Sequence, residues 1–239
     1  MNLIIDQGNT LFKVALFDDN ELISKESFSY SNIDLFNVWL SKKNIKTYNV
    51  IISSVVNNTI DLSKVSVNKI IQLDSTTKLP ISNKYKTPKT LGDDRLANAV
   101  AAYSISPKQN SLIIDFGTCI KYDIINSKGE YLGGNISLGL KMRYKALNQF
   151  TDQLPLIQPS ETVLQHGIDT KSSIICGVQS AICHEMEGFI EQYSKEFRGL
   201  TIFMTGGDLK YFDKSFKNDI FANSNLTLIG LNEILKHNV

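Results

Sequence analysis

An internal repeat constrains this chain more than any other feature. The segment LIIDQG at residues 3–8 returns as LIIDFG at residues 112–117, with five of the six positions identical. In both copies an apolar run leads into Asp-x-Gly, then a threonine, then a second strand-like run. Apolar runs joined by a polar turn predict β-hairpins, and a repeated unit predicts two related halves. Asp and Gly are common turn formers, but ordinary turns do not require the repeated Leu-Ile-Ile.

The rest of the chain alternates between helical and strand-like patterns. The expected helices cover residues 33–41, 96–103, 139–150, about 170–197 and 231–237, and the expected strands cover 50–56, 200–204 and 226–229. This alternation predicts an α/β fold. A polar, proline-containing segment at 106–110 predicts the boundary between two domains, 1–109 and 110–239.

Composition excludes several other classes of protein. The 239 residues carry 25 Lys and Arg against 24 Asp and Glu, a net charge of +1, whereas nucleic-acid-binding domains are usually basic. No apolar run approaches the length of a membrane helix, and the first residues lack the pattern of a signal peptide. The three cysteines show no zinc-binding spacing. We therefore expect a cytoplasmic protein without nucleic-acid or membrane partners.

The two Asp-x-Gly turns have the residues that a nucleotide site needs. Gly8 permits positive φ in the Asp6–Thr10 turn, and successive backbone amides in such a turn can bind an anion. Lys13 on the next strand can reach a phosphate, and Asp6 can hold magnesium through water. The second turn, Asp115–Thr118, repeats this chemistry. Two opposed hairpins of this kind predict a triphosphate site without a Walker loop.

Two further motifs stand next to predicted elements. Gly92-Asp93-Asp94-Arg95 precedes a helix, where carboxylates are favourable for capping alone. One of these carboxylates could instead act as a general base, while Arg95 binds an anionic group. Thr205-Gly206-Gly207-Asp208 follows a strand, either as a plain turn or as a surface against which a nucleotide lies.

With these motifs in order, the chain resembles the type III pantothenate kinases of bacterial coenzyme A synthesis. The matching segments are DQGNT with Lys13, ISSVV (52–56), Tyr85-x-x-Pro88, GDDR (92–95), IDFGT (114–118), GGNISLG (133–139), GLKMRYKAL with TDQLP, Thr170 and TGGD (205–208). The resemblance implies the actin-like ATPase superfamily, with two ribonuclease-H-like domains and a nucleotide cleft between them. It also implies homodimers that phosphorylate the primary hydroxyl of pantothenate with ATP and Mg²⁺ and need K⁺ or NH₄⁺.

The resemblance assigns roles to individual positions. Asp94 would be the catalytic base, Asp115 would bind the monovalent cation, and Thr170 would contact the substrate from the neighbouring subunit. By itself, Thr170 is typical of a helix N-cap. The ATP-binding positions would be Asp6, Gln7, Gly8, Asn9, Thr10, Lys13 and Thr118, and the pantothenate-binding positions Tyr85, Gly92, Asp93, Asp94 and Arg95.

The chain departs from the family pattern at two places. Cys119-Ile120-Lys121 stands where the family often has Ala-Thr-Thr, so Lys121 adds positive charge near the phosphates, and Leu138 replaces a common proline. Two other functions remain open from the residues: another small-molecule kinase or phosphatase of the same fold, and a non-catalytic nucleotide-binding regulator.

Overall fold

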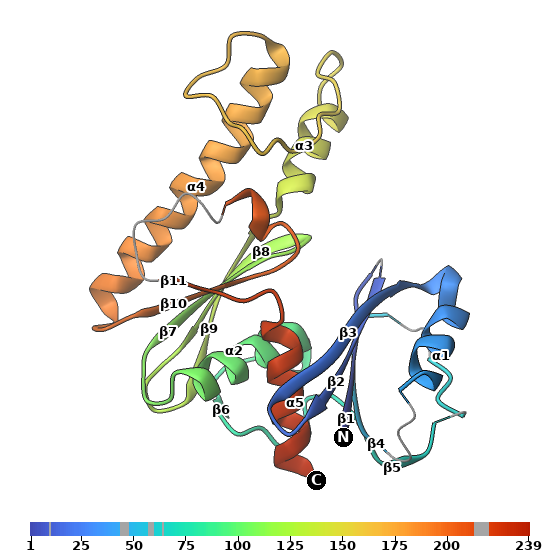
Figure 1. Cartoon of the computed structure of the whole chain (residues 1–239). Helices are drawn as coiled ribbons and strands as arrows, with labels where there is room; N and C mark the ends of the chain where they lie inside the picture. The colour runs from blue at the N-terminus through green and yellow to red at the C-terminus, as the bar shows by residue number, and fades with distance from the viewer. Residues whose placement is uncertain (10, 44–47, 57–59, 64, 213–219) are drawn as a thin grey trace. The chain divides into compact units, whose positions relative to one another are not determined.

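The computed structural model describes residues 1–9, 11–43, 48–56, 60–63, 65–212 and 220–239. These form two compact units, one of Met1–Ile105 with Asn225–Val239 and one of Ser106–Ser224 (Figure 1). The units differ from the expected ranges 1–109 and 110–239 in the C-terminal segment, which packs with the first unit. The correspondence of these units to two ribonuclease-H-like domains stays a prediction.

The first unit is built on a five-stranded sheet in the order β3-β2-β1-β4-β5. The central strand β1 pairs antiparallel with β2 and parallel with β4, and its residues Leu3, Ile4 and Ile5 are fully buried. The strands are β1 (Asn2–Gln7), β2 (Leu11–Asp18), β3 (Glu21–Ser29), β4 (Tyr48–Ser54) and β5 (Val67–Gln72).

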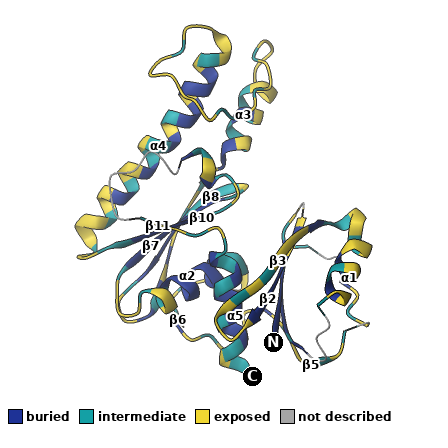
Figure 2. Ribbon diagram, viewed as in Figure 1, coloured by how far each residue is buried: buried dark blue, intermediate teal, exposed yellow. Residues whose placement is uncertain are grey.

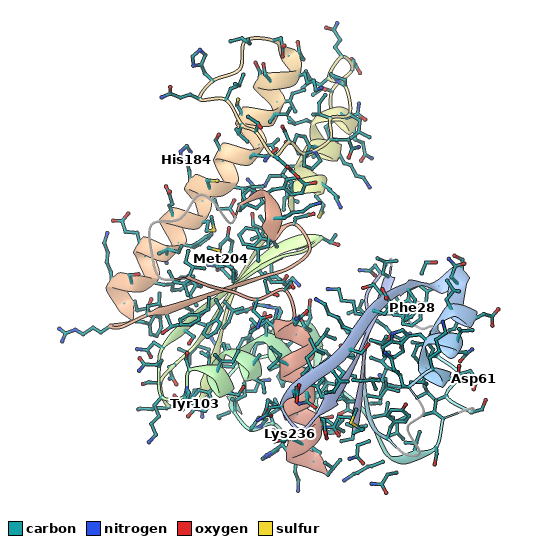
Figure 3. All side chains as sticks on the ribbon, viewed as in Figure 1. Phe28, Asp61, Tyr103, His184, Met204 and Lys236 are labelled. Carbon is teal, nitrogen blue, oxygen red and sulfur yellow. The ribbon has the colours of Figure 1, made fainter. Side chains whose placement is uncertain are left out.

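Helices complete this unit. The ring of Phe36 on α1 packs edge-on against Phe12 and Phe28, so α1 covers an aromatic core on the sheet (Figure 3 labels Phe28). Helix α5 packs on α2 and contacts β1 and β4. The remaining elements of the unit are η1 (Tyr30–Asn32), α1 (Ile33–Ser41), β6 (Ser82–Asn83), η2 (Pro88–Thr90), α2 (Asp93–Ile105) and α5 (Leu226–Asn238).

The C-terminal segment corrects one expectation. The expected strand at 226–229 is wrong, because these residues are the start of helix α5, Leu226–Asn238, which contains the expected helix at 231–237. Gly230, inside this helix, allows a close helix crossing. A Cβ atom at Gly230 would lie only 1.8 Å from the carbonyl oxygen of Ala97 on α2.

The second unit repeats the strand arrangement of the first. Within it the order is β11-β10-β7-β8-β9, and the central strand β7 pairs antiparallel with β8 and parallel with β10. The two hairpins predicted from the sequence repeat are therefore confirmed as β1–β2 and β7–β8. The strands are β7 (Ser111–Phe116), β8 (Cys119–Ile125), β9 (Glu130–Leu138), β10 (Thr201–Thr205) and β11 (Ile220–Ala222).

The long predicted helix is also confirmed, as α4 (Thr170–Glu196). One side of α4 is buried and the other exposed (Figure 2), and its residues Ile182 and Met186 enter a core that includes Met204 of β10 (Figure 3). The other helices of this unit are α3 (Leu140–Gln149) and the short η3 (Leu209–Tyr211). Among the described residues, no helix is both long and apolar enough to span a membrane.

Candidate active site

The first Asp-x-Gly turn is a tight connection between β1 and β2. The Gly8 amide donates to the Leu11 carbonyl oxygen over 3.1 Å, and the Tyr30 hydroxyl donates to the Gly8 carbonyl oxygen over 2.7 Å. Burial raises the pKa of Tyr30, a hydrogen bond with Gln7 offsets part of the rise, and the charge of Asp6 adds to it. Tyr30 therefore supports this turn as a neutral donor, a role that no motif in the sequence indicated.

Most of the predicted ATP-binding residues lie in or beside this turn. Asp6 is half-buried and accepts a hydrogen bond from Ser53 Oγ over 3.4 Å, whereas Gln7 is buried. Lys13 stands opposite Asp6 in the strand register, and Lys13 and Asn9 are both exposed. Thr10 lies outside the described residues. The exposed Lys13 ammonium and the exposed Asn9 side-chain amide are donors that can bind phosphate.

An acidic corner lies in the same unit, at the start of α2. Burial raises the pKa of Asp93 from 3.8 to about 6, and the charges of Asp94, Asp74 and Asp6 add to the shift. Carboxylates influence one another in this way only when they are close. The charge of Asp6 therefore acts on Asp93 across this corner of the unit. A cavity of about 360 Å³ beside them is lined by residues that include Ser54, Asp74, Gly92 and Asp93.

The remaining predicted pantothenate residues also meet at the start of α2. Asp94 Oδ1 accepts the Arg95 amide over 2.9 Å, and a Cβ atom at Gly92 would lie 2.6 Å from that oxygen. Gly92 thus leaves room for the Asp94 carboxylate. The Arg95 guanidinium lies 5.6 Å from the centre of the Tyr85 ring, within range of a cation–π interaction. Arg95 is only 4% exposed, so packing fixes its position.

The second Asp-x-Gly turn, in the second unit, is supported by two glycines from other motifs. A Cβ atom at Gly139 would lie 2.0 Å from the Thr118 carbonyl oxygen, and one at Gly206 would lie 2.5 Å from Phe116 backbone atoms. Gly206 also has φ +102°, a conformation that favours glycine. The GGNISLG and TGGD segments therefore pack directly against the turn. Thr118 at its tip is exposed.

The charged residues of the second turn form an ion pair. Lys121 Nζ lies 2.7 Å from Asp115 Oδ2, and the two side chains are only 14% and 12% exposed. Lys121 is expected from the sequence to add charge near the phosphates, but no motif pairs it with Asp115. The ammonium group of Lys121 already contacts this carboxylate. A free K⁺ or NH₄⁺ ion would therefore have to share the Asp115 carboxylate with Lys121. Among the described residues, no group of three or more His, Cys, Asp or Glu could hold a resident metal.

Thr170 lies in a different part of the second unit. It is the first residue of α4, and the N-cap is Asp169, whose carboxylate accepts the Ser172 amide over 2.7 Å. The expectation that Thr170 caps the helix is therefore wrong by one residue. Thr170 lines an apolar groove of about 860 Å³ between α3 and α4, together with residues such as Leu138 and Phe150. No residue of the Asp115–Thr118 turn lines this groove.

Comparisons with known proteins identify one family of similar sequences. Residues 2–192 match the family model of type III pantothenate kinases. A type III pantothenate kinase of Phocaeicola vulgatus is 44% identical over 242 residues, covering 100% of this chain and 99% of its own. One of Cytophaga hutchinsonii is 40% identical over 239 residues and covers both chains completely.

Solved structures show the same fold at low sequence identity. A protein of the Baf family of transcriptional activators from Campylobacter jejuni has a TM-score of 0.64 at 22% identity, covering 99% of this chain and 98% of its own. The ethanolamine utilization protein EutJ of Carboxydothermus hydrogenoformans has a TM-score of 0.55 at 11% identity, covering 98% and 89%. These neighbours and the two mixed sheets show an α/β fold of the actin-like ATPase type. The match of residues 2–192 to the family model and the full-length match to these relatives establish that the chain belongs to the type III pantothenate kinase family.

Proposed function

We propose that this chain transfers the terminal phosphoryl group of ATP to the primary hydroxyl of pantothenate, giving 4'-phosphopantothenate, the first step of coenzyme A biosynthesis. As a member of its family, the chain is a pantothenate kinase. The observation that carries the proposal is the group formed by Asp94, Arg95 and Tyr85 at the start of α2, beside a polar cavity. We expect the reaction to take place in the cytoplasm.

The two Asp-x-Gly turns are proposed to hold the triphosphate. In the first, Gly8, Asn9 and Thr10 would present donors to the phosphates, and Lys13 would place its charge on them. Because Gln7 is buried, its side chain would support the turn from within the unit and contact the nucleotide over only a small surface. In the second, exposed Thr118 would donate its hydroxyl. Phosphoryl transfer depends mainly on such positioning and charge neutralisation.

Magnesium is proposed to arrive with ATP rather than to reside in the protein. Mg²⁺ keeps several of its water molecules and binds through one or two carboxylates and the substrate phosphates. Asp6 fits that requirement because its half-buried carboxylate lies at the phosphate turn and near Asp93. Bound there, magnesium would neutralise the charge that develops on the phosphates.

The acceptor hydroxyl is proposed to lie against Asp94. The Arg95 amide hydrogen bond and the space at Gly92 fix the position of the Asp94 carboxylate, so it can orient the hydroxyl and accept its proton. Arg95 would hold the pantothenate carboxylate, and the Tyr85 ring beside it would keep the guanidinium in place. Asp93, whose pKa is about 6, lines the adjoining cavity. Its carboxyl would contact one edge of the bound pantothenate.

A homodimer is proposed as the active species. The groove between α3 and α4 is apolar and lined by Phe150, which is 81% exposed. An exposed aromatic beside a large apolar groove is typical of a protein interface. A second copy of the chain covering it would bring Thr170 towards the partner's pantothenate site, as the resemblance implies. The requirement for K⁺ or NH₄⁺ is implied only by the resemblance, and the ion pair of Lys121 with Asp115 argues against a free cation at this carboxylate.

ADP release tests the proposed function. ATP and magnesium should give ADP only when pantothenate is added, and a panel of other small hydroxy acids should give little. ADP release with a different hydroxy compound would favour another small-molecule kinase of this fold. ATP binding without turnover of any compound would favour a non-catalytic regulator.

A further inference from the structure

The ion pair between Lys121 and Asp115 lies in the largely buried β7–β8 hairpin of the second unit. Asp115 ends β7 and Lys121 stands opposite it on β8 in the strand register. Their charged atoms are 2.7 Å apart, and both side chains are at least 86% buried. Exposed ion pairs contribute little and are screened by salt, but a nearly enclosed pair holds its charges in place. Lys121 is therefore a fixed positive charge rather than a mobile surface lysine.

The pair lies directly at the second phosphate turn. A Cβ atom at Gly117 would be 3.7 Å from Asp115 Oδ1 and 4.0 Å from Lys121 Nζ. The first hairpin has the same register, with Lys13 opposite Asp6, but there the lysine side chain is exposed. The two halves thus use their lysines differently. Lys13 can move to a bound phosphate, whereas Lys121 is held on the carboxylate of its own hairpin.

A free monovalent cation at Asp115 would have to share this carboxylate. Lys121 already neutralises Asp115 within the hairpin, so a K⁺ ion at this carboxylate would have to compete with an ammonium group held 2.7 Å away. The K⁺ ion would also have to give up water in this nearly enclosed place, which has a desolvation cost. The lysine ε-ammonium, in contrast, is an ammonium ion on an alkyl tether and carries the same charge as NH₄⁺.

We infer that Lys121 replaces the monovalent cation at Asp115, so that phosphoryl transfer by this chain is independent of K⁺ and NH₄⁺. The inference rests on the proposed function, because it concerns the charge beside the second phosphate turn of that site. Lys121 would hold Asp115 and the turn at Gly117 in the arrangement that accepts the triphosphate. It is a positioning residue, since the ion pair places it on Asp115 rather than on a reacting atom.

The test compares salts at equal ionic strength. Pantothenate-dependent ADP release by the parent protein should be the same within about twofold in potassium, ammonium and tetramethylammonium chloride. A rise of about fivefold or more in potassium or ammonium would overturn the inference. Parent protein that is inactive with pantothenate in every salt would instead contradict the proposed function, so the two failures are distinguishable.

A Lys121→Thr variant makes the test sharper. It removes the tethered ammonium and restores the residue that the family often has at this position. Its activity should be low in tetramethylammonium and recover about tenfold or more in potassium or ammonium. Its melting temperature should rise in potassium relative to tetramethylammonium, while that of the parent stays constant. The exposed Lys128→Thr removes an equal charge from the β8–β9 turn and should behave like the parent.

Two results with the variants would refute the inference. Lys121→Thr with parent activity and no response to potassium would show that the ion pair is structural only. Weakened ATP binding in Lys121→Thr that potassium does not restore would show that Lys121 contacts a phosphate directly. If Lys121→Thr does not fold in any salt, the salt response of the parent protein alone decides.

Discussion

Replacing Asp93 by asparagine should stabilise the protein at neutral and alkaline pH. The Asp93 carboxyl is partly buried and faces the charges of Asp94, Asp74 and Asp6, which together raise its pKa from 3.8 to about 6. At about 1.4 kcal/mol per pKa unit, this difference corresponds to about 3 kcal/mol against the ionised form in the folded state. Partial exposure to solvent reduces the effect to about 1–2 kcal/mol. Asparagine also loses the favourable interaction of a negative charge with the N-terminus of α2, which reduces the gain in stability by about 0.3–1 kcal/mol.

The sign follows from the two protonation equilibria. Because the folded pKa lies above the unfolded one, the folded state binds more protons between about pH 4 and 6, so rising pH costs stability across that window. The neutral asparagine side chain of the variant has no charge to bury. The free energy of unfolding of Asp93→Asn should therefore match the parent near pH 4 and exceed it by about 1 kcal/mol above pH 7.

Urea denaturation of the parent and the variant at a series of pH values measures this difference. Asp34→Asn is the matched control, since Asp34 occupies the first turn of α1 but is exposed. That control should lose a few tenths of a kcal/mol at neutral pH and gain nothing. Destabilisation of Asp93→Asn at pH 8, or a gain that does not change with pH, would refute the reasoning.

Three other changes probe the site and the assembly. Asp94→Asn should lower kcat by about 10²–10⁴-fold, with ATP binding by calorimetry nearly unchanged, and parent-like turnover would remove Asp94 as the base. Lys13→Ala removes an exposed side chain, so the fold should persist while ATP affinity falls on the order of tenfold or more, and unchanged affinity would make the first hairpin purely structural. Phe150→Asp should give monomers by light scattering with little pantothenate turnover, whereas a fully active monomeric parent would contradict the dimer.

Local patterns predicted much of the fold. The repeated Asp-x-Gly hairpins could be read from sequence because each apolar strand and its polar turn are contiguous, and they appear as β1–β2 and β7–β8. The first turn of the C-terminal helix could not, because Gly230 fits there through a close contact with another helix that no local pattern shows. The contact partner, Ala97, is far away along the chain, and only the folded structure brings them together.

The candidate site also depends on contacts between residues that are far apart in the sequence. Sequence motifs identified Asp94 and Arg95 through the resemblance, but no local pattern shows that Asp74 and Asp6 lie near Asp93. Helix-end electrostatics alone predicts that loss of Asp93 destabilises the protein, and burial among like charges reverses that sign. The ion pair of Lys121 with Asp115 likewise depends on strand register, which the sequence does not state.

Transfer of the terminal phosphoryl group of labelled ATP to pantothenate tests the central claim most directly. Mass spectrometry of the product and its fragments identifies both the acceptor and the hydroxyl that carries the phosphate. We expect pantothenate phosphorylated at its primary hydroxyl with the parent protein and a strongly reduced yield with Asp94→Asn. Unlabelled pantothenate after incubation with folded, ATP-binding parent protein would contradict the claim.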